Sequence, residues 1–390
     1  MGKREAVIVG VADLPLRDGK VTAPMSVLQA QALCARDALA DAGIAMREVD
    51  GLLTAGMWGV PGPGQLATVT LSEYLGIAPR FVDGTNIGGS AFEAHVAHAA
   101  TALEAGRCEV ALITYGSLQR SEASRNLAGR PSVLTMQYET PWGMPTPVGG
   151  YALAAMRHMH EHGTTSQQLA EIAVATRQWA ALNPAATMRG PLSIDDVLAS
   201  PMISDPLHLL DACLVTDGGG AVVMTTAEHA RAIGHRKPVH VRGYGEAHTH
   251  WTIAAMPDLA RLTAAEIAGR EAFAMAGVRP DGIDVVEVYD SFTITVLLTL
   301  EALGFCKRGE GGAFVANQRT APGGAFPMNT NGGGLSYAHP GMYGIFLLIE
   351  AVRQLRGECG PRQVQDAATA LVHGTGGTLS SGATCILSTH

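Results

Sequence analysis

The amino-acid sequence predicts an α/β protein made of two similar halves, and three observations support this prediction. Apolar, β-branched runs alternate with amphipathic stretches along most of the 390 residues, which is typical of strands followed by helices. Hydrophobic residues make up 47% of the chain and charged residues only 16%, which favours a large packed core. A glycine-rich segment also occurs twice, as "TNIGGSAFEAH" from Thr85 and as "TNGGGLSYAHP" from Thr330.

The first half begins with the apolar strand "EAVIVGVADLPL" (5–16), followed by the helix "MSVLQAQALCARDALADAG" (25–43) that ends at Gly43. A further helix, "SAFEAHVAHAATALEAG" (90–106), precedes the strand "CEVALITYGS" (108–117). Because helices join successive strands, we expect a mostly parallel sheet with helices on both of its faces.

The pattern loosens after Ser117, where a polar and turn-rich stretch leads into two helices, "YALAAMRHMHEHG" (151–163) and "SQQLAEIAVATRQWAALNP" (166–184). The strand "GGGAVVMTT" (218–226) then returns to the core. We therefore expect a loop-domain insertion at about 118–205, resting on the core and covering a substrate. The predicted halves are 1–235 and 236–390.

The second half repeats the order of the first. A strand, "VHVRGYGEA" (239–247), comes before a second strand, "IDVVEV" (283–288), and the apolar helix "SFTITVLLTLEALG" (291–304). The repeated glycine-rich segment leads to the strand "ATALVHGTGG" (368–377). Each half thus offers a glycine turn before a helix N-terminus, where backbone N–H groups and the helix dipole suit a developing oxyanion.

Charge and composition exclude several classes of partner. The net charge of −8 argues against nucleic acid, and no apolar run reaches the length of a membrane span. The chain opens into a strand without a signal-peptide pattern, and its six cysteines have no CxxC or metal-type spacing. We expect a cytoplasmic protein with reduced thiols and without a bound metal.

Four stretches carry a family resemblance: "LLDACLVTDGGGAVV" (209–223), "VYDSFTITVLLTLEALGFCKRGEGGAFV" (288–315), "NTNGGGLSYAHPGMYG" (329–344) and "LVHGTGGTLSSGATCILS" (371–388). In this order they resemble the thiolase superfamily, and most closely the sterol-carrier-protein-type thiolases and their bacterial thiolase-like relatives. The resemblance implies the thiolase fold, with two similar βαβαβαββ halves in five layers (αβαβα). It also implies Claisen-type chemistry on an acyl-CoA.

The resemblance places the catalytic positions residue by residue. The histidine of the family's Gly-His-Pro motif corresponds to His339 in "SYAHP", and its Asn or His position to Tyr289 in "VYDSF". The acid/base position near the C-terminus corresponds to His373 in "LVHGTGG", and the nucleophilic cysteine to Asn86 or its neighbour in "GTNIGG".

Two departures from the family pattern decide the expected chemistry. Asn86 cannot form an acyl-enzyme, and none of the cysteines lies in its turn. Tyr289 supplies a phenol where thiolases have an amide or imidazole, and Tyr337 adds another phenol two residues before His339. Thiolase-like acyl-CoA aldolases also lack the cysteine and use tyrosines, so the resemblance implies retro-aldol cleavage of a β-hydroxyacyl-CoA. Acyl transfer of the thiolase type and a non-catalytic acyl-CoA-binding subunit remain the alternatives.

In this reading Tyr289 and Tyr337 are the acid/base candidates, with His373 at the third catalytic position. His339, together with backbone N–H groups near Gly88 and Gly376, would stabilise the enolate. A tyrosine has a pKa near 10 in water, so a tyrosine base needs positive charge or hydrogen bonds close by.

Weaker candidates complete the list. Tyr244 and Tyr343 are possible substrate contacts, whereas Ser90 is a poor substitute nucleophile because a helix turns it away from the nucleophile position. The cysteines Cys213 and Cys306 lie in apolar runs and are interpreted as structural.

The "HMHEH" stretch (158–162) is interpreted as a solvated helix end, because the middle histidine leaves the helix face of the other two. The insertion also carries the candidate CoA-phosphate ligands Arg120, Arg125 and Arg130.

The resemblance implies partners as well. Coenzyme A enters only as part of the substrate, and no covalently bound cofactor is expected. We expect at least a homodimer, assisted by a small partner protein that combines a zinc ribbon with an OB-fold domain.

Overall fold

Two halves with the same order of elements form the protein, which is described by a computed structural model over residues 4–56, 66–122 and 133–390. The first half contains β1 (Ala6–Asp13), α1 (Val27–Ala42), β4 (Gly51–Leu53), α2 (Ala67–Leu75), β5 (Phe81–Asp83), α3 (Ala91–Glu104), β6 (Val110–Ser117) and β9 (Gly218–Thr226). The second half contains β10 (Val239–His248), α9 (Thr263–Ala276), β11 (Val285–Val288), α10 (Thr293–Ala302), α12 (Gly344–Arg356), β12 (Thr369–Gly376) and β13 (Ser381–Ser388). Met328, which bridges parallel to Val286, stands where the third strand of the second half would be. The βαβαβαββ order predicted for each half is therefore confirmed.

Among the described residues, one sheet joins the strands of both halves in the order β11-β12-β13-β10-β1-β9-β6-β4-β5. The two halves meet where β10 pairs with β1, and from there outward each half has the same order of strands. The pairing between the halves is short and joins Val7 with His240 and Ile8 with Val239.

The expected mostly parallel sheet is wrong. Only β4–β5, β4–β6 and β11–β12 are parallel, and the remaining neighbours run antiparallel. The reason is that each half ends in two consecutive antiparallel strands. In the first half the insertion leaves at Ser117 and returns at Gly218, which face each other in the ladder, so it acts as one long hairpin connection.

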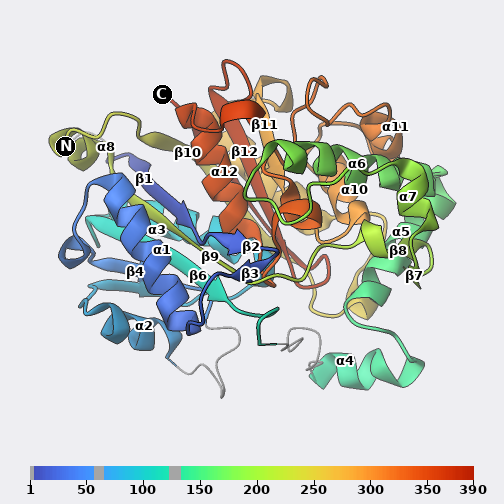
Figure 1. Ribbon diagram of the computed structural model, residues 1–390, viewed down its shortest axis with the longest axis horizontal. Helices are drawn as coiled ribbons and strands as arrows, with labels where there is room; N and C mark the ends of the chain where they lie inside the picture. Colours follow the sequence, from blue (N-terminus) through green and yellow to red (C-terminus); the bar gives the residue numbers. More distant parts are fainter. Residues whose placement is uncertain (1–3, 57–65, 123–132) are drawn as a thin grey trace.

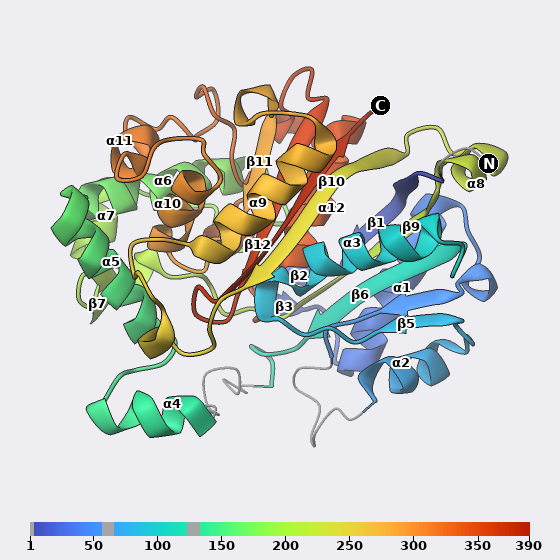
Figure 2. The same ribbon diagram turned by 180° about the vertical axis from the view of Figure 1, so that it is seen from behind.

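Three apolar clusters define the layers. One lies between α1 and the outer face of the first-half strands, and another lies between the second-half strands, α9 and α10. The third joins both sets of strands to the central helices α3 and α12, which are buried over most of their length. Figure 1 shows α1 in front of the first-half strands, and Figure 2 shows α9 on the opposite side of the molecule. This five-layer arrangement confirms the predicted fold class.

The insertion packs on the second half. It contains α4 (Val133–Tyr138), α5 (Val148–His162), α6 (Ser166–Leu182), α7 (Ile194–Ala199), β7 (Met202–Ser204) and β8 (Leu207–His208). Helices α5 and α6 contact α10, whereas α4 extends away from the body (Figure 1). Smaller elements are β2 (Leu16–Arg17), β3 (Lys20–Val21), α8 (Ala227–Ala232) and α11 (Gly311–Val315).

Helix ends agree with the sequence signals. Gly43 closes α1 in the left-handed conformation (φ 69°), as expected for glycine after a helix. All six cysteines are free thiols, and four of them are buried. In the part of the chain that the structure describes, every helix is too short or too polar to cross a membrane.

Candidate active site

Four segments from both halves meet in one place. The turn from Thr85 to Ser90, which precedes α3, packs against the β12–β13 turn and against the ring of Tyr289. A methyl group on Gly88 would lie 2.7 Å from the nitrogen of Gly377, and one on Gly89 would lie 2.1 Å from Cε2 of Tyr289. Only glycine permits these approaches, so the glycines of the turn are required for packing as well as for backbone conformation.

The hydroxyl of Tyr289 and the imidazole of His339 form a hydrogen-bonded pair, with 2.8 Å between the hydroxyl oxygen and Nε2. The same oxygen accepts a hydrogen bond from the backbone nitrogen of Tyr343 at 3.1 Å. The rings of Tyr289 and His339 stand edge to face, with their centroids 5.6 Å apart. Two of the predicted catalytic residues are therefore in direct contact.

Both members of this pair are neutral near pH 7. Although His339 as a whole residue is partly exposed, burial of its ring lowers the pKa to about 4. Burial raises the pKa of Tyr289 well above its usual value, and neighbouring thiol and phenol groups add to the rise. A neutral imidazole with one free nitrogen lone pair can accept the tyrosine proton, so the pair can move a proton without resting as an ion pair.

Backbone bonds hold His339 in place. Its N–H donates to Oγ1 of Thr216 at 2.9 Å, and the N–H of Thr216 donates back to the carbonyl of His339 at 3.2 Å. Thr216 is fully buried, whereas its neighbour Val215 is 46% exposed. Thr216 belongs to the "LVTDGGG" stretch. Nothing in the sequence indicated that this stretch orients His339.

Asn86 lies exposed near the start of the Thr85–Ser90 turn, which we name the catalytic turn because the expected nucleophile position falls in it. Its side-chain oxygen accepts the N–H of Gly88 at 3.2 Å, which closes a small turn on itself. The predicted oxyanion donor near Gly88 is therefore engaged within the turn, and the amide nitrogen of Asn86 is the donor this position can offer a ligand. Ser90 donates to the carbonyl of Ile87 and pairs with Ser381 at 2.9 Å, as befits a structural hydroxyl.

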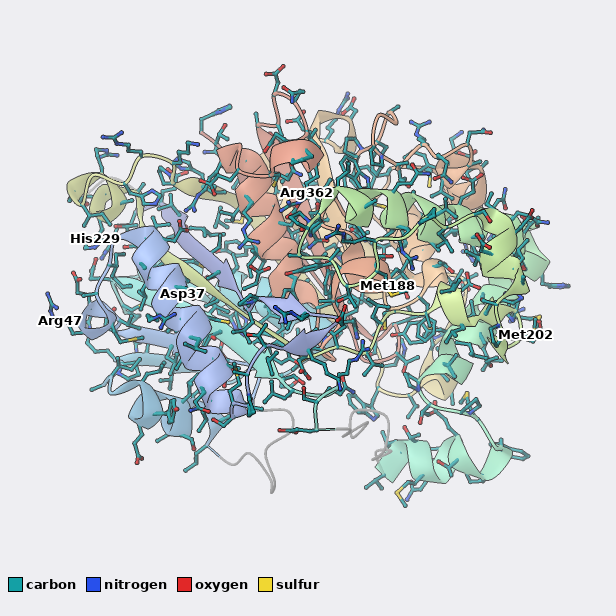
Figure 3. The ribbon with its side chains drawn as sticks, in the orientation of Figure 1. Asp37, Arg47, Met188, Met202, His229 and Arg362 are labelled. Carbon is teal, nitrogen blue, oxygen red and sulfur yellow. The ribbon has the colours of Figure 1, made fainter. Side chains whose placement is uncertain are left out.

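Tyr337 does not join the pair. Its hydroxyl donates to Asp13, whose other oxygen forms an ion pair with Arg353 at 2.7 Å. These residues line a separate cavity of about 350 Å³ together with Arg362, which Figure 3 labels. The π-helical turn Gly333–Tyr337 directs this side chain away from His339, and so adjacency in sequence was misleading.

His373 also points elsewhere. Side chains alternate along a strand, and Val372 faces the central layer with Tyr289, so His373 faces the opposite side, near α9. Its Nδ1 bonds to Oγ1 of Thr384 at 2.8 Å, and burial lowers its pKa to about 3. His373 is therefore next to Tyr289, whose backbone N–H donates to the His373 carbonyl at 3.0 Å, but its imidazole lies on the other face of the strand from the Tyr289–His339 pair.

The weaker candidates fall into two groups. Tyr343 is fully buried, and its hydroxyl donates to Asn331 at 2.8 Å, so it is a packing neighbour that helps to hold Tyr289 in place. Gly376 lies at the contact with the catalytic turn, where its missing side chain makes room for the carbonyl of Ile87. Tyr244, by contrast, is on β10 and bonds to Thr101 near the far end of α3.

The remaining predicted residues are the arginines of the insertion. Arg120 is exposed, and its backbone nitrogen donates to Asp217. Arg125 and Arg130 lie outside the described residues.

In the "HMHEH" stretch, His158 is buried against Thr164 and Glu301, so the interpretation of a solvated helix end is wrong for that residue. Within the described ranges no group of three potential ligands is placed to hold a metal. Cys213 and Cys306 are partly buried, and both were interpreted as structural residues from the sequence.

Several residues near the site escaped the sequence reasoning. Tyr151 of α5 donates its hydroxyl to the carbonyl of Gly377 at 2.9 Å and packs on Phe292, so the insertion reaches the site. Tyr115 donates to the carbonyl of Pro340 at 2.7 Å. Asp290 accepts the N–H groups of Gly334 and Leu335, and burial raises its pKa to about 6. Of these three residues, only Asp290 could have been found from the sequence, because it follows Tyr289 directly in the "VYDSF" motif.

Comparisons with known proteins agree with this geometry. The family described as "Thiolase C-terminal domain-like" matches residues 245–389. An acetyl-CoA acetyltransferase of Methanothermobacter thermautotrophicus is 33% identical over 359 residues, covering 90% of this chain and 91% of the relative. A protein of Mycobacterium tuberculosis named 17-hydroxy-3-oxo-4-pregnene-20-carboxyl-CoA lyase is 34% identical, covering 91% and 92%. The solved structure named "Ltp2-ChsH2(DUF35) aldolase" superposes with a TM-score of 0.87 at 30% identity, covering 99% of this chain and 98% of that one.

Proposed function

The chain belongs to the thiolase superfamily, and from this premise we propose that it cleaves a β-hydroxyacyl-CoA by a retro-aldol reaction. The products are a ketone or aldehyde and a shorter acyl-CoA. The observation that carries the proposal is the neutral Tyr289–His339 pair beside a catalytic turn that contains Asn86 in place of a nucleophile. Similarity to the lyase of Mycobacterium tuberculosis supports the same reaction class.

The pair supplies the base. The Tyr289 oxygen takes the proton of the substrate β-hydroxyl while its own proton passes to Nε2 of His339, 2.8 Å away. The electrons of the broken O–H bond form the new carbonyl, the Cα–Cβ bond breaks, and its electron pair enters the thioester as an enolate. The proton then returns through the same pair to Cα. Between the two transfers His339 carries the proton as an imidazolium beside the enolate, and both residues are neutral again once the proton has reached Cα, as their shifted pKa values favour in the resting enzyme.

The enolate oxygen needs a hydrogen-bond donor. The resemblance assigns the nucleophile position to Asn86 or its neighbour, and the hydrogen bond from the N–H of Gly88 fixes the orientation of the Asn86 amide. A neutral amide stabilises negative charge without offering an attacking atom, so this residue favours enolate chemistry over acyl transfer. Coenzyme A is needed only as the substrate's carrier group, with Arg120 among its candidate phosphate contacts.

A bulky polycyclic acyl group fits the proposal best. The named substrate of the Mycobacterium tuberculosis relative is the CoA ester of a steroid acid with a 17-hydroxyl group. In this chain Tyr151 and Phe292 bring aromatic surface from the insertion to the site. Acyl transfer remains the second candidate, because another relative at similar identity is named an acetyltransferase.

We further propose a homodimer and a small partner protein. Strand β5 ends the sheet next to the catalytic turn, and Val82 at its centre is 47% exposed, so a second copy can pair along this edge. The similar aldolase structure bears the names of two components, one of them ChsH2(DUF35). A partner with a zinc ribbon and an OB-fold domain would cover the bulky acyl group.

The test is a screen of β-hydroxyacyl-CoA esters with the protein alone and after co-expression with a DUF35-type partner. Release of acetyl-CoA or propionyl-CoA with a matching ketone or aldehyde is the expected result. Transfer of an acyl group to free CoA, without a carbonyl product, would favour the acetyltransferase alternative. Binding of every ester with no product of either kind would favour a non-catalytic subunit.

A further inference from the structure

A buried carboxyl group without a partner lies directly beneath the catalytic turn. Glu93 is in the first turn of α3, one helical turn after Gly89, and only 1% of its surface is exposed. Among the described residues neither of its carboxyl oxygens has a hydrogen-bond partner. A buried polar group without a hydrogen-bond partner destabilises a fold, and such groups are rare in proteins unless they have a function.

Two glycines make the space for this carboxyl group. A methyl group on Gly374 would lie 2.2 Å from Oε2 of Glu93, and one on Gly344 would lie 2.5 Å from the same atom. Gly374 belongs to β12, and Gly344 opens α12. The two positions therefore have room for a carboxyl group only because they carry no side chain.

These contacts place Glu93 at the junction of α3, β12 and α12, which lead to the site. Helix α3 continues directly from the catalytic turn, and β12 leads to the Gly376–Gly377 contact with that turn. Helix α12 follows Tyr343, whose N–H donates to the hydroxyl of Tyr289. A displacement of the carboxyl group would therefore reach both Tyr289 and the catalytic turn.

Among the residues that the structure describes, no positively charged group acts on the Glu93 carboxyl. Burial raises the pKa of its carboxyl to about 8, and only a bond to its own backbone opposes that rise. The titratable groups that the structure places near it are the thiol of Cys385 on β13, which donates to the carbonyl of Glu93, and Glu246 of β10, whose carboxylate also acts on that thiol. Ionised Glu93 would be an unpaired charge in a dry junction.

We infer that Glu93 is a positioning residue, whose neutral side chain fills the space between α3, α12 and β12 and whose ionisation loosens the catalytic turn. This sets the alkaline limit of the enzyme. The activity part of the inference rests on the proposed retro-aldol function, whereas the stability part does not.

The test compares wild type with Glu93→Gln, which keeps the shape but cannot ionise. Exposed Glu271→Gln on α9 is the matched control. The folded-state pKa of Glu93 is raised above its unfolded value, so its stabilising contribution is complete below pH 4.5 and is lost as the pH rises towards about 8. Wild type and the control should lose several degrees of unfolding temperature over that range relative to Glu93→Gln. In turnover assays normalised at pH 7, Glu93→Gln should move the alkaline limb upward by about one pH unit or more.

Parallel unfolding curves of wild type and Glu93→Gln between pH 5 and pH 9 would overturn the inference, whatever reaction the protein catalyses. Altered stability with an unchanged alkaline limb would reduce Glu93 to a structural residue. If the glutamine variant does not fold, Glu93→Met supplies a second neutral side chain of similar size. Absence of turnover in all variants would count against the proposed function, and the unfolding curves would still decide the role of Glu93.

Discussion

Removing the hydroxyl of Tyr289 is the most direct perturbation of the proposed mechanism. Tyr289→Phe keeps the ring that packs against Gly89 and deletes one oxygen, which bonds to His339 at 2.8 Å and accepts the N–H of Tyr343 at 3.1 Å. The relay from substrate to imidazole is then broken. We expect turnover to fall by about 10²-fold or more, the usual cost of a lost general acid or base.

The stability of the variant should fall only modestly. The substitution leaves a buried N–H and an imidazole nitrogen without their partner, which costs about 1–3 kcal/mol. Binding of the CoA ester should stay close to wild type, because the hydroxyl is used in the reaction more than in ground-state binding. Turnover is measured as acyl-CoA release from a β-hydroxyacyl-CoA identified by the screen, and binding by calorimetry.

Tyr337→Phe is the matched comparison. It deletes the same atom from an equally buried tyrosine, but one whose hydroxyl donates to Asp13 and lines a different cavity. If the structure identifies the reacting phenol correctly, this variant should lose stability and keep most of its turnover. The reasoning is refuted if Tyr289→Phe turns over at nearly the wild-type rate, or if Tyr337→Phe shows the larger loss.

Two further outcomes follow from the site. Incubation with acyl-CoA should leave the chain unmodified in intact-mass spectra, because neither Asn86 nor Ser90 is an activated nucleophile, and a stoichiometric adduct in the Thr85–Ser90 turn would contradict retro-aldol chemistry. His339→Ala should cost about 3 kcal/mol of transition-state stabilisation in kcat/KM, about 10²-fold, since one preorganised group is lost. An unchanged kcat/KM would show that another group accepts the tyrosine proton.

The fold could be predicted to a large extent from local patterns. Hydrophobic runs, glycine helix ends and the repeated "TN-GG" segments identified both halves and the insertion, because these features depend on neighbours close in the sequence. The direction of the strands could not be read in the same way. Ser117 and Gly218 are antiparallel partners because the insertion of about a hundred residues between them returns to the neighbouring position in the sheet. The residues next to either end do not determine where the insertion returns.

The sequence predicted which segments come together at the site, but it predicted less well which side chains of those segments point into it. Motif positions placed Tyr289 and His339 correctly beside the catalytic turn, whereas the roles assigned to them stay predictions. Tyr337 and His373 were chosen for their positions along the chain, but a side chain's direction depends on backbone detail. One π-helical turn directs the Tyr337 hydroxyl to Asp13, and one step of strand alternation turns the His373 imidazole to the far face of its strand, although both residues stay close to the site in the fold.

The glycines illustrate what a sequence motif leaves open. In "GTNIGGSA" and "HGTGG" the glycine-rich turns were interpreted as sources of free N–H groups for an oxyanion. The structure uses Gly88 and Gly376 mainly for close approach of the two turns, and the N–H of Gly88 is already bonded to Asn86. The donor left for the thioester oxygen is then the Asn86 side chain itself. We therefore propose that Asn86 takes part in the new chemistry, because its amide oxygen closes the turn while its amide nitrogen keeps N–H groups that can donate to the thioester oxygen.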